Sequence, residues 1–244
     1  MSLGFGHLAR IGHLYPSGGL CDYEIQSMAP EGVQFVTTRL PFRTTGVADD
    51  LRLLQNLEQH ARLLADADVD VIAVNCTAAT LLAGPERIRE RISEATGIGS
   101  ITTIEAVLAA LSAARIRRPA LLTPYPDEVV HAETEFLHSH GIEVATHLGL
   151  PRATPVEQAM IEPGRWLGLA STLDPSTIDG VLLSCAGIRI AGALQRIEDR
   201  LGLPVVASNQ ALLWHLLRTL GIPARPKGYG ALLAGRFDSG TPCP

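Results

Sequence analysis

Two cysteines, Cys76 and Cys185, are the best candidates for catalytic residues in this chain, because of the sequence around them. Each follows an apolar run with an aspartate near its start, over residues 69–74 and 178–183, and each is followed by small residues. Apolar runs of this length, rich in branched side chains, predict buried strands. Ligands bind beyond the carboxyl ends of strands in open parallel sheets, so we expect both thiols to lie at a ligand site.

Two thiols on opposite faces of one carbon would supply the base and the acid that an inversion or isomerisation needs. A free thiol has a pKa of about 8.5, and we expect hydrogen-bond donors or a helix N-terminus to lower it toward the thiolate form at neutral pH. The proton beside a carboxylate is much less acidic, so the site must stabilise an enediolate with donors worth about 3 kcal/mol each. With an unsaturated diacid, a thiolate could instead add covalently, allow rotation and leave.

The composition argues against several other classes of protein. The 244 residues carry a net charge of −5 without a basic cluster, which argues against nucleic-acid binding. No apolar run approaches the roughly 20 residues of a membrane span, and the first residues do not resemble a signal peptide, so we expect a cytoplasmic protein with no membrane partner. The single lysine, Lys227, lies in a Gly/Pro-rich segment, and no metal-ligand spacing is present, so we predict neither a cofactor nor a metal.

Strands and helices alternate along the chain, which predicts an α/β fold built on parallel sheets. The expected strands cover residues 9–15, 33–39, 69–74, 100–103, 119–123, 142–148, 178–183 and 204–208. The expected helices cover residues 49–64, 85–97, 105–111, 126–140, 193–202 and 210–217. Residues 151–163 are predicted to be irregular or partly helical, and residues 225–244, with Cys243, a mobile or packing tail.

The order of elements after Cys76 recurs after Cys185, which indicates a structural duplication. We therefore predict two pseudo-symmetric α/β lobes, each a parallel sheet with helices on both faces. Residues 1–117 and 211–244 would form the first lobe, and residues 118–210 the second. The active site would then lie in the interlobe cleft, where the two cysteines meet.

Two loops supply further candidate binding residues. Ser17, Gly18 and Gly19 follow the first expected strand, and small residues there would let a ligand approach the backbone closely. Tyr125 lies on a loop between a strand and a helix, where binding groups are common. Cys21 is expected to pack in the core.

Several segments together resemble a known family. Asn75-Cys76-Thr77-Ala78, Ser184-Cys185-Ala186-Gly187, Pro124-Tyr125 and residues 204–211 are similar to motifs of the Asp/Glu racemase superfamily, in its branch of maleate cis-trans isomerases and arylmalonate decarboxylases. The resemblance covers nearly the whole chain. It implies that Cys76 and Cys185 flank a small carboxylic acid or diacid. It also implies a homo-oligomer, either a dimer or a dimer of dimers.

The same resemblance assigns the substrate-binding groups. It implies that the Tyr125 hydroxyl and the backbone at Thr77, Ala78 and Ala186 bind carboxylate oxygens, and it places Asn75 and Gly187 in the same site. The chain departs from the family pattern in two ways. Maleate isomerases carry an asparagine in the loop where Gly19 stands, and arylmalonate decarboxylases lack the first cysteine.

These observations together predict a cofactor-independent isomerase or racemase of a small carboxylic acid that uses Cys76 and Cys185 on opposite faces of the substrate. Two alternatives stay open. One is decarboxylation of a malonate, with Cys185 protonating the enediolate. The other is a non-catalytic protein that binds a small acid.

Overall fold

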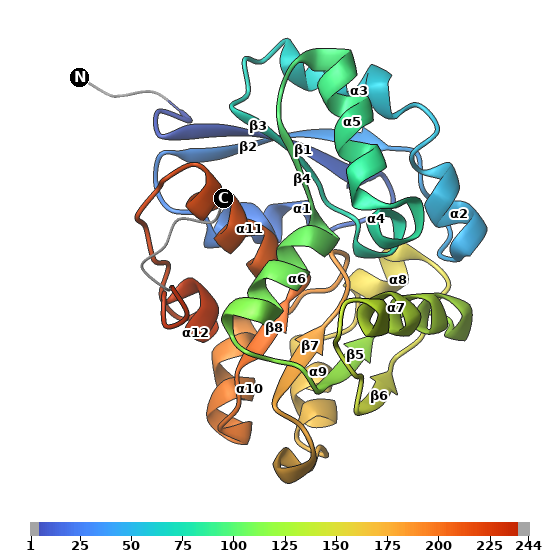
Figure 1. Ribbon diagram of the computed structural model, residues 1–244, viewed down its shortest axis with the longest axis vertical. Coiled ribbons are helices and arrows are strands. Elements are labelled where there is room, and N and C mark those ends of the chain that lie inside the picture. Colours follow the sequence, from blue (N-terminus) through green and yellow to red (C-terminus); the bar gives the residue numbers. More distant parts are fainter. Residues whose placement is uncertain (1–4, 239–244) are drawn as a thin grey trace.

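Eight short strands form two parallel sheets in the computed structural model, which describes residues 5–238. The first sheet has the strand order β2-β1-β3-β4 and the second has the order β6-β5-β7-β8, so the two sheets repeat one topology (Figure 1). The strands are β1 Ala9–Pro16, β2 Val33–Leu40, β3 Val71–Val74, β4 Ser100–Thr102, β5 Pro119–Thr123, β6 Thr146–Gly149, β7 Gly180–Leu183 and β8 Val205–Ala207. The predicted two-lobed α/β fold is confirmed.

Helices surround both sheets, as expected when the strands are buried on both faces. They are α1 Asp22–Met28, α2 Val47–Arg52, α3 Leu57–Ala65, α4 Thr77–Ala83, α5 Pro85–Thr96, α6 Thr103–Ala113, α7 Asp127–Ser139, α8 Pro155–Ala159, α9 Pro163–Ala170, α10 Leu194–Leu201, α11 Ser208–Thr219 and α12 Gly230–Leu233. Short 3₁₀ turns cover Pro175–Thr177 and Ala191–Ala193. Within residues 5–238, none of the helices has the length and apolar character needed to cross a membrane.

The structure corrects two of the expected elements and adds helices that were not expected. The helix predicted over residues 49–64 is two helices, α2 and α3, because the buried Leu53 and Leu54 lie in a tight turn in which the Leu54 N–H bonds to the Leu51 carbonyl. The strand predicted over residues 142–148 begins only at Thr146. Helices α1, α4 and α9 form where no helix was predicted, whereas α8 agrees with the prediction that residues 151–163 are irregular or partly helical.

The segment after α11 packs on the molecule as far as it is described. Asp238 accepts a hydrogen bond from the Trp214 indole and pairs with Arg218 and Arg225. The packing alternative predicted for this tail therefore holds for residues 225–238, whereas Cys243 lies outside the described residues.

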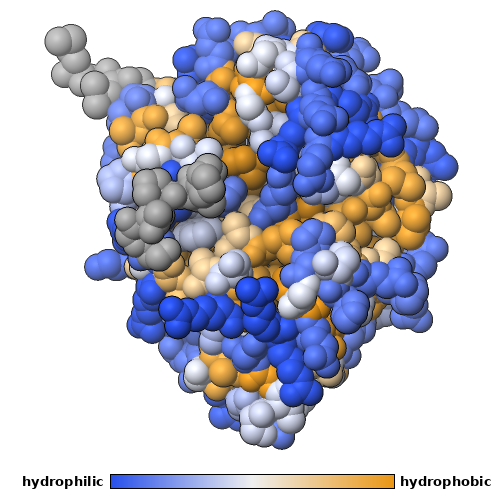
Figure 2. All heavy atoms as spheres, viewed as in Figure 1, coloured by the Kyte–Doolittle hydropathy of each residue, from blue (hydrophilic) through white to orange (hydrophobic). Residues whose placement is uncertain are grey.

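A continuous hydrophobic core joins the two lobes. Helices α6 and α11 lie side by side at the junction (Figure 1). The core cluster around them includes Ile104 and Leu213 from these helices together with Leu121 and Leu182 from the second sheet. In Figure 2, hydrophilic residues cover the outer helices α3 and α5, while hydrophobic residues extend across the middle of the molecule. The junction is thus held by apolar burial as well as by polar contacts.

A partly buried glutamate also fastens the first lobe to the second. One oxygen of Glu24, on α1, accepts the backbone N–H groups of Ile190 at 2.6 Å and Ala191 at 2.8 Å. Its other oxygen accepts the Asn209 amide at 3.0 Å. These contacts hold the segment that follows Cys185 against α1, so Glu24 fixes the second cysteine loop relative to the first lobe.

We expect Glu24→Ala to lower the free energy of unfolding by about 2–4 kcal/mol, because it leaves three buried donors without an acceptor. Urea denaturation followed by circular dichroism measures the change. Glu31→Ala, at an exposed loop glutamate, is the matched control and should stay within about 0.5 kcal/mol of the wild type. Equal effects of the two substitutions would contradict the bridging role of Glu24.

Candidate active site

Cys76 and Cys185 line the same cavity, which lies between the two lobes. Each cysteine immediately follows the turn that ends an equivalent strand, β3 for Cys76 and β7 for Cys185. The cavity is narrow: a water-sized sphere can reach only about 20 Å³ inside it, about the room of one water molecule, so in this conformation it suits only a small molecule. Its lining consists of Tyr15, Pro16, Gly19, Phe42, Thr45, Asp50, Cys76, Ala78, Tyr125, Pro155, Gln158, Cys185, Ala186 and Gly187.

A buried polar network fixes the turn that carries Cys76. The Asn75 amide donates to His13 Nε2 at 3.0 Å and to Asn209 Oδ1 at 3.0 Å, and its oxygen accepts the Thr103 hydroxyl at 2.9 Å. Burial lowers the pKa of His13 to about 4, so its ring is neutral and can accept this hydrogen bond. Asn75 therefore supports the turn behind the cavity and does not line it.

An aspartate from α2 lies beside the first thiol. The Cys76 thiol donates to Asp50 Oδ1, with 3.7 Å between sulfur and oxygen. Asp50 is only 1% exposed, and burial raises the pKa of its carboxyl group to about 7. Its second oxygen, Oδ2, is buried without a hydrogen-bond partner of normal geometry among the described residues, and the backbone N–H of Gly46 lowers the pKa of the carboxyl group by less than burial raises it. Asp50 therefore brings a carboxylate with an unused acceptor into the cavity.

The second thiol has a different set of neighbours. Cys185 Sγ accepts the Gly187 N–H at 3.1 Å and lies 3.6 Å from Gln158 Oε1, and the Tyr125 hydroxyl also hydrogen-bonds to it. The Cys185 backbone N–H donates to the Ser208 hydroxyl at 3.1 Å. The same hydroxyl accepts from Thr77 Oγ1 at 2.9 Å, so it ties the two cysteine loops together.

Burial makes both cysteines thiols at neutral pH, which corrects the prediction that local donors would make them thiolates. Desolvation raises the pKa of Cys185 to about 12 and that of Cys76 well above its ordinary value. The Gly187 N–H and the Tyr125 hydroxyl lower the pKa of Cys185, but by less than burial raises it. Cys76 also faces the Asp50 carboxylate, whose charge raises the thiol pKa further.

The structure brings most of the predicted site residues together. Gly19, Ala78, Tyr125, Ala186 and Gly187 line the cavity with the two cysteines. Four others lie outside the lining, and each has a structural role there: Ser17, Gly18, Asn75 and Thr77. The Ser17 hydroxyl and the Gly18 N–H bond to the backbone of Phe42, and the Thr77 side chain bonds to Ser208.

The Tyr15 side chain, from the end of β1, packs against the loop that follows this strand. The Tyr15 hydroxyl donates to the Ala186 carbonyl at 3.2 Å and accepts the Cys21 N–H at 3.1 Å, which joins the loops of the two lobes. A Cβ atom at Gly19 would lie 2.5 Å from the Tyr15 ring. The small residue at position 19 therefore makes room for the tyrosine, and this part of the loop cannot direct a larger side chain into the cavity.

Sequence reasoning missed half of the cavity wall. The residues it did not propose are Tyr15, Pro16, Phe42, Thr45, Asp50, Pro155 and Gln158. Most come from loops and short helices that carry no periodic pattern, and Asp50 was interpreted only as the start of a helix. No group of three His, Cys, Asp or Glu side chains within residues 5–238 could hold a metal ion.

Comparisons with known proteins agree with this arrangement. A family model described as arylmalonate decarboxylase matches residues 12–233. An arylmalonate decarboxylase from Bordetella bronchiseptica is 30% identical over 226 residues, covering 89% of this chain and 92% of the relative. A maleate isomerase from Geobacillus stearothermophilus is 24% identical over 246 residues, covering 93% of this chain and 98% of the relative.

A solved structure shares the fold closely. It is a cysteine-to-serine variant of the Nocardia farcinica maleate cis-trans isomerase with a covalently bound succinylcysteine intermediate. The two structures superpose with a TM-score of 0.87 at 24% identity, covering 95% of this chain and 99% of the other. The fold defines a two-lobed α/β protein with a cavity between duplicated halves. The chain belongs to the arylmalonate decarboxylase family, which also includes the maleate isomerases.

The contact between Asp50 and Cys76 predicts a change in thiol reactivity. Asp50→Asn removes the charge that raises the pKa of Cys76, so alkylation of Cys76 by iodoacetamide at pH 8 should accelerate, by about tenfold for each unit by which its pKa falls. Peptide mass spectrometry measures the rates at Cys76 and Cys185 separately.

Asp49→Asn is the matched control, because Asp49 is the neighbouring carboxylate on α2 and pairs with Arg52 at the surface. It should leave the alkylation rate of Cys76 nearly unchanged. If both substitutions gave the wild-type rate, Asp50 would not govern the thiol.

Proposed function

We propose that this chain is a cofactor-independent isomerase or racemase of a small carboxylic acid, with Cys76 and Cys185 acting on opposite faces of the substrate. The observation that carries the proposal is that both thiols, one from each lobe, line a single small cavity. Relatives that are maleate isomerases support the class of reaction. The covalent succinylcysteine of the Nocardia farcinica protein supports a reacting cysteine in this fold.

In the proposed reaction one cysteine removes a proton as thiolate, and the other donates a proton as thiol from the opposite face. Because both groups are buried thiols in this structure, one of them must lose its proton before it can act as the base. The enediolate formed between them needs hydrogen-bond donors. The Tyr125 hydroxyl lies at the cavity beside Cys185, and α4 begins at Thr77, so the first N–H groups of that helix have no acceptor within it.

The proposal predicts exchange of the substrate α-proton with solvent. In D₂O, wild-type protein should introduce deuterium at the α-carbon of its substrate, and Cys76→Ser or Cys185→Ser should each slow this exchange by about 10²–10⁴-fold, the usual contribution of a general acid or base. Proton NMR measures the rates.

Cys21→Ser is the matched control for these variants. Cys21 is buried outside the cavity lining and its thiol bonds to the Gly187 carbonyl at 3.2 Å, a contact that a hydroxyl can keep. This variant should retain the wild-type exchange rate. Exchange that persisted in both Cys76→Ser and Cys185→Ser would eliminate the two-cysteine mechanism.

Decarboxylation of a substituted malonate is a second candidate function. Two comparisons favour it. The family model that matches residues 12–233 is described as arylmalonate decarboxylase, and the relative at 30% identity is an arylmalonate decarboxylase. In that reaction loss of carbon dioxide itself generates the enediolate, so a single thiol, Cys185, would suffice to protonate it.

The two candidates differ in what they require of Cys76. Decarboxylation predicts carbon dioxide release from phenylmalonate that persists in Cys76→Gly and disappears in Cys185→Ser, measured by a coupled bicarbonate assay. The isomerase proposal predicts no release from the wild type. Carbon dioxide release that required Cys76 would contradict both candidate functions.

A further inference from the structure

The cavity contains one charged side chain, and it is an acid. Asp50 lines the cavity, is 1% exposed, and has one oxygen on the Cys76 thiol and the other, Oδ2, without a partner. Among the described residues of the lining there is no lysine, arginine or histidine. A buried acceptor without a donor is costly, so the free oxygen indicates a ligand group that would complete it.

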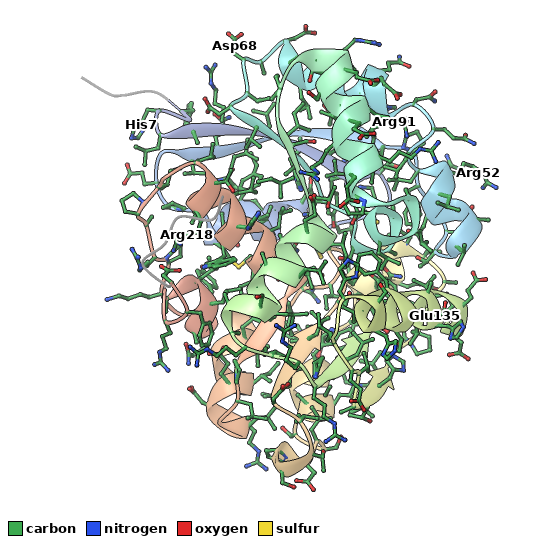
Figure 3. The ribbon with its side chains drawn as sticks, in the orientation of Figure 1. His7, Arg52, Asp68, Arg91, Glu135 and Arg218 are labelled. Atoms are coloured by element: carbon green, nitrogen blue, oxygen red, sulfur yellow. The ribbon has the colours of Figure 1, made fainter. Side chains whose placement is uncertain are left out.

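The surroundings of Asp50 are also acidic. Asp49 and Glu128 both raise the pKa of Asp50 through their charges. The basic side chain closest in sequence, Arg52, pairs with Asp49 at 2.6 Å and extends from α2 at the outer edge of the molecule (Figure 3). A carboxylate placed beside Asp50 would thus be buried against like charge with no cation to balance it.

The remaining walls favour a single carboxylate and an apolar substituent. The Tyr125 hydroxyl lies near Cys185 and can donate to one carboxylate. Phe42, Pro16 and Pro155 are apolar. The loop at Gly19 offers no side-chain donor, because the Tyr15 ring fills the space beside it. A second carboxylate would therefore find only backbone N–H groups, and no cationic side chain, in the described lining of this cavity.

We propose that Asp50 binds a nitrogen-bearing hydrogen-bond donor on the substrate carbon that Cys76 and Cys185 act upon, so that the substrate is a small nitrogen-bearing monocarboxylic acid and not a dicarboxylic acid. The donor is an ammonium, as in an α-amino acid, or an amide N–H, as in its N-acyl derivative. This inference rests on the proposed function, since it assigns the substrate class of the same site.

Deuterium exchange with four defined probes tests the assignment in the full chain. The nitrogen-bearing probes are alanine and N-acetylalanine, and the dicarboxylic probes are methylsuccinate and maleate. We expect wild-type protein to exchange the α-proton of at least one nitrogen-bearing probe with a kcat/KM at least tenfold above that for methylsuccinate, and not to isomerise maleate faster than it exchanges that probe.

Asp50→Asn distinguishes the two nitrogen donors, because it removes the charge and keeps one acceptor oxygen. An ammonium substrate should show at least a tenfold rise in KM, whereas an amide substrate should change less than threefold. Glu90→Gln, which alters an exposed carboxylate on α5 outside the cavity lining, should leave both values unchanged.

The pH dependence gives a readout that a merely structural role would not produce. The groups facing Asp50 are Cys76, Cys185, Asp49 and Glu128, and burial raises the pKa of Asp50 to about 7. Asp50 therefore gains its charge between pH 6 and pH 8. Affinity for alanine should rise over this window in the wild type and be flat in Asp50→Asn, whereas affinity for methylsuccinate should fall.

Each outcome decides between the two proposals. Cysteine-dependent turnover of methylsuccinate or maleate in preference to the nitrogen-bearing probes would leave the proposed function standing and overturn the assignment of Asp50. Absence of cysteine-dependent turnover with every probe would overturn the proposed function. In that case calorimetry measures binding without turnover and tests only whether Asp50 binds a nitrogen donor. Equal affinities for alanine, N-acetylalanine and methylsuccinate would overturn this role of Asp50.

Discussion

The site depends on polar contacts that cross the junction of the two lobes and hold the two cysteine loops together. The Ser208 hydroxyl accepts from Thr77 beside Cys76 and from the backbone of Cys185. Tyr15 and Glu24, both from the first lobe, bind the backbone that follows Cys185. The Ser208, Thr77 and Tyr15 side chains are fully buried, so each loses water on folding and must find its partner in the protein. That requirement fixes the loops more tightly than apolar packing alone would do.

The same burial governs the chemistry. Removing water raises the pKa of both thiols and of Asp50, and the local donors compensate only in part. A buried thiol is a poor base but a competent proton donor, so the arrangement favours the acid role in both cysteines until a substrate changes the local charge. A ligand carboxylate would raise these pKa values further, whereas a ligand cation would lower them. The charge of the substrate therefore influences whether one of the thiols can lose its proton and act as a base.

Local patterns predicted the sheets and the two thiols, because both depend on short stretches of sequence. The apolar runs before Cys76 and Cys185 form β3 and β7, and the Pro85 start and Gly97 stop of α5 agree with the structure. The rest of the cavity wall depends on tertiary placement. Asp50 reaches Cys76 because the chain turns at Leu53 and Leu54 between α2 and α3, and no periodic pattern marks that turn. Gln158 comes from α8, in a segment predicted only to be irregular or partly helical, so no pattern indicated that its side chain would reach Cys185.

The duplication makes the backbone of the two halves alike and leaves their chemistry different. Both thiols follow equivalent strands, and a backbone N–H lowers the pKa of each, from Ala79 at Cys76 and from Gly187 at Cys185. Cys76 also faces a carboxylate, whereas Cys185 faces a phenol and an amide oxygen. Donors around Cys185 stabilise a negative sulfur, and the Asp50 carboxylate opposes one at Cys76. Because the backbone repeat cannot impose this difference, it must come from the side chains at Asp50, Tyr125 and Gln158. The two faces of a bound carbon would thus meet thiols of unequal acidity, so proton removal should be easier from the side of Cys185 than from the side of Cys76.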